Sequence, residues 1–461
     1  MKKVLQGSLK YIFVFSLALF ALVFFSLYTN NWDSIWNYGF SYSIAKGQIP
    51  YRDFTMIIPP FYNYLMSIGL IIFSHDNIVM LIEQALVITI AFHFLYKLYD
   101  YKAWVLIAVM CFPQFISFSL TYNTFLFFAF TILLYLEEKK KNDYLVGVIL
   151  SILILTKYTV GVFFLIPSII FYYKDKEKLL KRFIGLIIPC LIFLIYLIVS
   201  NSLIEFIDLC ILGLIDFGSN NTLVRTIYFT LSIIGLIISL IVLIKDKKKI
   251  LNWYVLFSFT IMIPNFSAYH FYSYNMFIGL LLISNLDKFN LSKRYIVSVS
   301  LTVILLLTSF YTIQIFDFKT KSLKLHPFKV HNFYYYFDTD DAKEHFLYVN
   351  KIYEDYKKMG DVYYLTPSCP IWMSVVHEEG TNYFTILNKG NYGYNGTKKM
   401  INKARKMKNT YFVIDTKHYY EDRYGSRSRF DQFDYEIVDD ILKHSKLVEN
   451  RGKYHIYYKE K

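Results

Sequence analysis

Charged residues and cysteines are both scarce in this chain. Only 18% of its 461 residues are charged, whereas 55% are hydrophobic. Soluble domains rarely have this composition, so the chain is predicted to be an integral membrane protein. The four cysteines form no Cys-x-x-Cys pair, and neither a disulfide framework nor a zinc site is indicated. A glycine-rich phosphate loop is also lacking, because residues 390–396 have no Lys-Ser/Thr ending.

Long apolar stretches fill the first two thirds of the chain and predict about eleven transmembrane helices. They lie near residues 11–28, 78–96, 103–119, 122–136, 144–157, 159–173, 183–200, 226–244, 250–265, 271–286 and 295–316. Segment 60–73 is apolar too, but it is short and begins at the Pro59-Pro60 pair. It is predicted to be a juxtamembrane or re-entrant helix that does not cross.

Lysine and arginine gather in alternate loops, which predicts the topology. The basic groups are Lys2, Lys3 and Lys10, Lys97 and Lys102, Lys139–Lys141, Lys174–Arg182, Lys245–Lys249, and Lys288–Arg294. Before residue 317 the other loops contain only Lys46, Arg52, Lys157 and Arg225. By the positive-inside rule the N-terminus is cytoplasmic and the first external loop, residues 29–77, lies outside. These lysines are read as topology signals and contacts to anionic lipids, with no nucleic-acid role.

The chain divides into two predicted domains. Residues 1–316 form the transmembrane domain, and residues 317–461 form a polar tail that the topology places outside the cytoplasm. The tail shows expected helices at 341–359 and 397–408 and expected strands at 362–366, 411–415 and 454–458. This order predicts a small extracytoplasmic α/β domain.

The first external loop contains two carboxylates, Asp33 and Asp53, in a polar and aromatic segment. Its apolar residues Ile35, Tyr38, Tyr42 and Ala45 recur at helical spacing and predict a short surface helix. Gly47 is the expected C-cap. The chain then becomes extended before Pro50 and reaches Arg52 and Asp53.

This loop contains the patterns D-x-x-W-x-Y, A-K-G-Q-I-P-Y-R-D-F and P-P-x-Y-x-Y. With these patterns it resembles the first external loop of GT-C fold glycosyltransferases. The similar branch is the bacterial one, related to the protein mannosyltransferases and the aminoarabinose transferase. Segment 155–161 around Lys157 looks like that branch's lysine-containing turn, and segment 267–271 looks like its late His-aromatic segment. One difference is that Ser34 follows Asp33, where many members have a second acid.

The resemblance implies a membrane enzyme that moves a sugar from a polyprenyl-phosphate donor to a cell-envelope polymer, glycolipid or protein at the outer leaflet. A single displacement would invert the anomeric configuration. Asp33 would be the general base; the alternative is an N-cap. Asp53 would position the acceptor or, together with Asp33, a divalent metal ion as cofactor. The alternative for Asp53 is a local ion pair with Arg52 that fixes the loop.

Five further residues are candidates for binding the donor phosphate or sugar: Arg52, Lys157, Tyr158, Tyr269 and His270. A lysine in an apolar run is expected to have a partner or a ligand, unless it extends to the membrane surface. For His270 the alternative is an ordinary interfacial histidine. Glu205, Asp208, Asp216 and Arg225, in outer segment 201–225, are candidates for acceptor contacts, with a solvated face as the alternative.

Two other classes of membrane protein remain open. A flippase for lipid-linked oligosaccharides needs polar residues along several helices, whereas the helix interiors here are almost uncharged apart from Glu83. A polysaccharide polymerase or ligase usually has an extended outer loop that contains arginine. The acidic first loop favours the glycosyltransferase over both.

Overall fold

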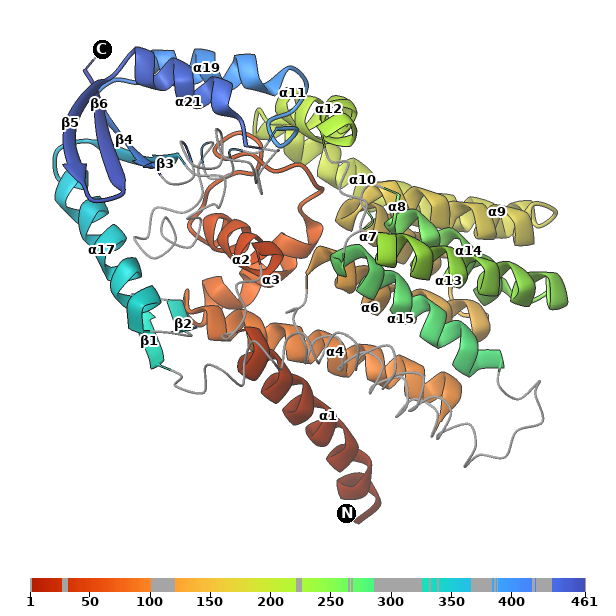
Figure 1. Ribbon diagram of the computed structural model, residues 1–461. Coiled ribbons are helices and arrows are strands. Elements are labelled where there is room, and N and C mark those ends of the chain that lie inside the picture. The colour runs from red at the N-terminus through yellow and green to blue at the C-terminus, as the bar shows by residue number, and fades with distance from the viewer. Residues whose placement is uncertain are drawn as a thin grey trace. The chain divides into compact units, whose positions relative to one another are not determined.

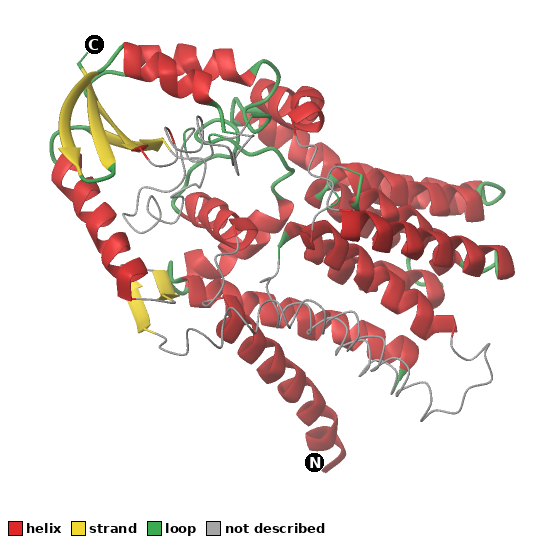
Figure 2. Ribbon diagram, viewed as in Figure 1, coloured by secondary structure: helices red, strands yellow, loops and turns green. Residues whose placement is uncertain are grey.

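The computed structural model is mostly helical, with two small β-sheets (Figures 1 and 2). It describes residues 2–26, 32–100, 121–220, 226–263, 266, 268–285, 326–330, 333–337, 340–365, 384, 387, 389–416, 419 and 433–460. The predicted crossings at 103–119 and 295–316 lie outside the described residues. The chain divides into two compact units, which differ from the predicted split at residue 316.

The first unit comprises residues 1–38, 59–196 and 223–323. Its described helices are α1 (Lys2–Ser26), the start of α2 (Trp32–Ala45), α3 (Phe61–Ile72), α4 (Asn77–Tyr99), α6 (Tyr122–Glu138), α7 (Asp143–Thr156), α8 (Tyr158–Gly161), η1 (Val162–Phe164), α9 (Leu165–Tyr172), most of α10 (Lys176–Val199), α13 (Thr226–Lys245), α14 (Ile250–Ser258), η3 (Phe259–Ile261) and α15 (Ala268–Asn285).

Three described helices are long and apolar enough to cross a membrane: Asn77–Tyr99, Lys176–Val199 and Ile227–Lys245. The membrane character predicted from composition therefore has structural support, while the figure of about eleven crossings stays a prediction. Helix α3 has 12 residues and is about 18 Å long, well short of the ~30 Å hydrocarbon core. The short helix predicted in segment 60–73 is therefore present.

The centre of the first unit is aromatic. Phe130 from α6, Phe164 from η1 and Phe277 from α15 lie with ring centroids 5.1–5.9 Å apart. Tyr254 from α14 packs edge-on against Phe130 and Phe164. Aromatic contacts of this kind add to the stabilisation from buried area, and they fix α6 against the segments that follow Lys157.

The second unit comprises residues 39–58, 197–222 and 324–461. Its segment 197–222 contains α11 (Leu203–Phe206), the π-helical turn η2 (Ile207–Leu212) and α12 (Gly213–Asn220). Its C-terminal part has the hairpin β1 (His326–Val330) and β2 (Phe333–Phe337), then α17 (Asp340–Lys357), β3 (Asp361–Leu365), α19 (Gly396–Lys406), β4 (Thr410–Asp415), α21 (Tyr435–Lys443), β5 (Lys446–Arg451) and β6 (Tyr454–Lys459).

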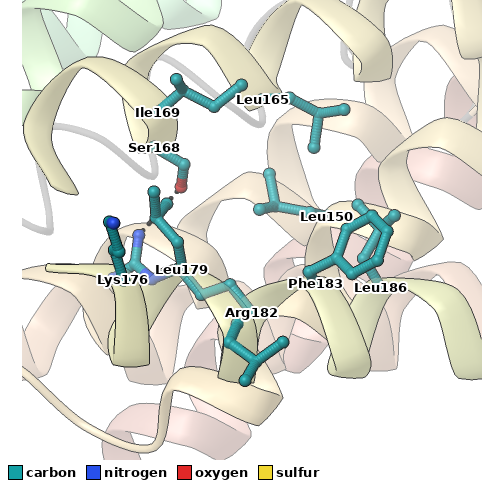
Figure 3. A pocket seen from close by; sticks show the side chains of 10 residues that line it. Leu150, Leu165, Ser168, Ile169, Lys176, Leu179, Arg182, Phe183 and Leu186 are labelled. Atoms are coloured by element: carbon teal, nitrogen blue, oxygen red, sulfur yellow. Dashed lines mark hydrogen bonds between the residues drawn. The ribbon is translucent and has the colours of Figure 1, made fainter. Parts of the chain in front are cut away.

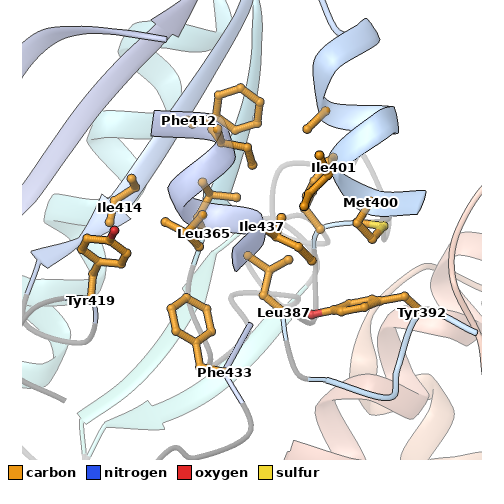
Figure 4. Close-up of a cluster of buried hydrophobic side chains, with 14 residues drawn as sticks. Leu365, Leu387, Tyr392, Met400, Ile401, Phe412, Ile414, Tyr419, Phe433 and Ile437 are labelled. Atoms are coloured by element: carbon orange, nitrogen blue, oxygen red, sulfur yellow. The ribbon is translucent and has the colours of Figure 1, made fainter. Parts of the chain in front are cut away.

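The main sheet has the order β3-β4-β6-β5, with β3 parallel to β4 and the other pairs antiparallel. Helices α19 and α21 supply apolar side chains to a core cluster with the sheet (Figure 4). Phe412 and Ile414 project from β4, and Ile437 projects from α21. The three strands and two helices predicted in the tail are present, whereas β1, β2, β5 and α21 were not predicted.

Candidate functional site

A helix, α2, is present where the surface helix was predicted, but its residues 37–44 are all buried. The prediction of a helix was therefore confirmed, and its placement on the surface was wrong. The helix begins at Trp32, so Asp33 lies inside its first turn. A carboxylate there interacts favourably with the helix dipole, but the side chain of Asp33 lies outside the described residues. The helix ends at Ala45, two residues before the predicted C-cap Gly47, whose φ of +85° suits glycine. The Gly47 amide donates to Ile44 O over 2.9 Å.

A tight turn at residues 50–54 follows this helix. Tyr51 is fully buried with a φ of +71°, which is an uncommon conformation for a bulky residue. Its amide donates to Phe54 O over 3.0 Å, and its hydroxyl donates to Ile58 O over 2.8 Å. Phe54 is also buried and stacks on Phe40 with ring centroids 5.7 Å apart. These contacts fix the turn that carries the two charged residues between Tyr51 and Phe54.

Arg52 and Asp53 form a bidentate pair on this turn. Arg52 Nε donates to Asp53 Oδ1 over 2.8 Å, and a terminal nitrogen donates to Oδ2 over 3.0 Å. The Ile49 amide adds a third bond to Oδ2, at 2.7 Å. The Arg52 hydrogen bond and the Ile49 amide hold the pKa of Asp53 below its usual range. The two side chains stay 45% and 29% exposed, so the pair is accessible to a ligand.

Segment 197–222 of the second unit contacts both the first loop and the tail. Phe206 packs edge-on against Tyr51 with ring centroids 5.2 Å apart, and Cys210 Sγ donates to Met56 O at 3.6 Å. Asp208 forms an ion pair with Lys399 of α19. Asp216 Oδ2 accepts the Asn395 amide at 2.8 Å. Two of the four acidic or basic candidates in segment 201–225 therefore bind the tail, and Arg225 lies outside the described residues.

Lys157 lies in the first unit, where it interrupts the helical run. It is extended between α7 and α8 and only 5% exposed. Its Nζ donates to Asn123 Oδ1 over 2.7 Å and lies 5.7 Å from the centre of the Tyr122 ring. The lysine is thus buried with a polar partner and does not extend to the surface. Tyr158, the first residue of α8, is half-buried beside it.

His270 lies in the first turn of α15 and is 9% exposed. The side chain of the neighbouring candidate Tyr269 lies outside the described residues. Within the first unit, the structure thus buries both Lys157 and His270, while the second unit presents Arg52 and Asp53 on an anchored turn.

Sequence reasoning missed a buried ionic network in the first unit. Arg182 binds Glu137 with two bonds of 2.7 and 2.8 Å, and its Nε donates to Asp143 over 2.8 Å. Tyr254 and Tyr172 donate to the same Glu137 carboxylate over 3.0 and 3.2 Å. The only signal in the sequence was a glutamate at the end of an apolar helix. Arg182 looked like one more member of a basic cluster.

A metal site is not evident in the part of the chain that the structure describes, where no group of three or more His, Cys, Asp or Glu side chains could hold an ion. Comparison with protein-family models, curated proteins and solved structures found no match. The function therefore has to be argued from the residues and their geometry.

Proposed function

We propose that this chain is a membrane glycosyltransferase that uses a polyprenyl-phosphate-linked sugar. The acceptor would be a cell-envelope polymer, a glycolipid or a protein at the outer leaflet. The resemblance of the first external loop to GT-C enzymes suggests this reaction. Three helices that are long and apolar enough to cross a membrane are compatible with a lipid-linked donor.

The turn around Arg52 and Asp53 is the observation that carries the proposal. Buried aromatic residues hold it in a conformation that is costly for Tyr51. Strain of this kind is typical of functional sites, where the surrounding structure maintains it. Between the buried anchors, a cation and a carboxylate remain accessible to solvent.

The proposed chemistry needs a base, a group that binds the leaving phosphate and a path for the lipid. Asp33 is the proposed base that takes the proton from the acceptor hydroxyl as it attacks the anomeric carbon. Arg52 suits a phosphate because a guanidinium has five N–H donors and can bind a phosphate along one edge while another edge binds Asp53, and Asp53 would orient it. Lys157, already buried with Asn123, would stabilise negative charge on the donor side, with His270 as a further candidate contact.

The test is transfer by the purified full chain in lipid nanodiscs, given a panel of labelled polyprenyl-phosphate sugars and an envelope extract as acceptor. We expect Asp33→Asn to lower the transfer rate at least about 100-fold, the usual contribution of a general base. Arg52→Gln should reduce the rate while the protein remains folded. The matched control is Asp361→Asn, an exposed carboxylate of the tail, which should transfer at the wild-type rate.

Two outcomes would contradict the proposal. Wild-type rates in both Asp33→Asn and Arg52→Gln would exclude this loop from the reaction. Movement of a lipid-linked oligosaccharide across the bilayer without sugar transfer would favour the flippase instead. If transfer occurs, nuclear magnetic resonance of the product should show an inverted anomeric configuration.

A further inference from the structure

A cavity of about 530 Å³ lies between α7, α9 and α10 of the first unit (Figure 3). Its volume is within the ~300–1,000 Å³ range of small-molecule sites. Seven of the ten residues that line it are apolar, and the other three are Ser168, Lys176 and Arg182. Figure 3 shows Lys176 and the Ser168–Arg182 hydrogen bond at one end of the cavity, with Leu150, Phe183 and Leu186 toward the other. The site is therefore amphipathic.

Among the residues that the structure describes, the polar end of the cavity has one cation to offer a ligand. Arg182 is engaged by Glu137 and Asp143, and its bond to Ser168 Oγ is 2.8 Å long. Lys181, on the next turn of α10, pairs with Glu177 over 2.6 Å. Lys176, by contrast, is exposed and has no ion-pair partner among the residues that the structure describes. An anion at this end would meet an ammonium whose charge is not already neutralised.

The apolar wall of the cavity is open along the side of the helices. Ile169 is 54% exposed, and Leu180 and Phe183 are each 57% exposed. Helix α10 is one of the three candidate spans. Only 17% of its 18-residue apolar stretch is buried by the protein. Exposed apolar surface of this extent on a spanning helix is suited to contact with acyl chains. Lys176 is the first residue of α10, so it marks the level at which the span meets the head groups.

We infer that this cavity binds an anionic phospholipid, with the phosphate on Lys176 and one acyl chain along Ile169, Leu180 and Phe183. The charge of the head group complements the Lys176 ammonium, and the apolar walls exclude a free hydrophilic anion as the preferred ligand. The Arg182 network below the cavity keeps α10 close to α7 and maintains the shape of the site. The inference does not depend on the proposed glycosyltransferase activity, since none of the candidate catalytic residues lines the cavity.

Native mass spectrometry of the full chain in detergent micelles tests the inference, with dioleoyl-phosphatidylglycerol and dioleoyl-phosphatidylcholine as probes. We expect wild type to retain the anionic lipid more strongly than the zwitterionic one. Lys176→Gln should weaken binding of the anionic lipid about fivefold, the effect of one basic residue near a membrane surface, and leave phosphatidylcholine unchanged. Lys398→Gln, at an exposed lysine on α19 of the tail and outside the basic loops, is the matched control and should bind both lipids as wild type does.

A second variant tests the apolar part of the site. Ile169→Trp should fill the cavity and weaken both lipids, and Leu180→Trp serves the same purpose if the first variant does not fold. Equal retention of the two lipids by wild type, or an unchanged affinity in Lys176→Gln, would overturn the inference. A third result would also overturn the inference: millimolar inorganic phosphate displaces the anionic lipid, and both tryptophan variants bind lipid normally. The site would then recognise only a free anion.

Discussion

Lys403 of α19 is half-buried, and the loss of hydration lowers the pKa of its ammonium to about 8, with nearby Glu205 partly offsetting the effect. In the unfolded chain a lysine keeps a pKa of about 10.4, so between these values the unfolded state binds more protons. Stability should therefore rise as the pH increases from about 8 to 10, and the full cost of burying the charge should apply below pH 8.

Replacing Lys403 with methionine tests this directly, because methionine retains an unbranched apolar chain. We expect Lys403→Met to unfold at a higher temperature than wild type at pH 7, and the difference should shrink as the pH approaches 10. Thermal unfolding in detergent at several pH values measures it. Lys398→Met, at an exposed position on the same helix, is the control; a similar pH-dependent gain there would show that burial is not the cause.

Single residues also show the limit of reasoning from sequence. A lysine within an apolar run had to have a polar partner, and Lys157 has one in Asn123. The identity of that partner was not predictable, because it is 34 positions away and depends on how α6 packs against α7. The same holds for Arg182 and Glu137, which are separated by 45 positions. Local patterns indicate which residues need a partner, while tertiary packing selects the partner.

At the scale of elements, α7 and α10 pack through two glycines. A Cβ added to Gly147 would lie 2.0 Å from Arg182 O, and one added to Gly185 would lie 2.1 Å from Tyr144 O. Both neighbours are backbone atoms, so neither can move without separating the helices. Small residues allow this close approach between membrane helices.

We expect Gly147→Ala and Gly185→Ala each to lower the free energy of unfolding by about 1–3 kcal/mol, the usual cost of overpacking. The double variant should cost less than the sum, because either methyl group already forces the same two helices apart. Chemical unfolding in mixed micelles measures both effects. Leu145→Ala, at a side chain that is 48% exposed on α7, should change stability by no more than about 0.5 kcal/mol. Strict additivity of the glycine variants would argue against a shared contact.

Elements with a strong apolar pattern were predictable, and those without one were not. Strands β3, β4 and β6 contain the aromatic and branched residues that favour sheets. Strand β5 reads Lys-Leu-Val-Glu-Asn-Arg and lies at the edge of the sheet, where charged residues prevent pairing with other chains. Its composition resembles a loop, and only its pairing with β6 makes it a strand.

At the scale of the whole molecule, the second unit is assembled from three separate stretches of chain, residues 39–58, 197–222 and 324–461. A sequence read in order divides at residue 316, where the apolar runs end, and has no means of grouping the first loop with the tail. The grouping depends on contacts made by η2. Asp208 pairs with Lys399. Gly393, which has a φ of +84°, also approaches the Asp208 carboxylate: a Cβ added to Gly393 would lie 2.1 Å from Asp208 Oδ2.

A charge exchange tests whether this contact holds segment 197–222 to the tail. Asp208→Lys and Lys399→Asp should each speed amide hydrogen exchange in both η2 and α19, because each places like charges together, while the double variant should return exchange toward the wild-type rate. Since Lys399 is 51% exposed, the coupling should amount to about 0.2–1 kcal/mol, or a change of up to about fivefold in exchange rate. Lys398→Asp on the same helix controls for the added acid. If the double variant exchanges as fast as either single variant, the ion pair does not hold these two segments together, and the close approach at Gly393 becomes the contact to test next.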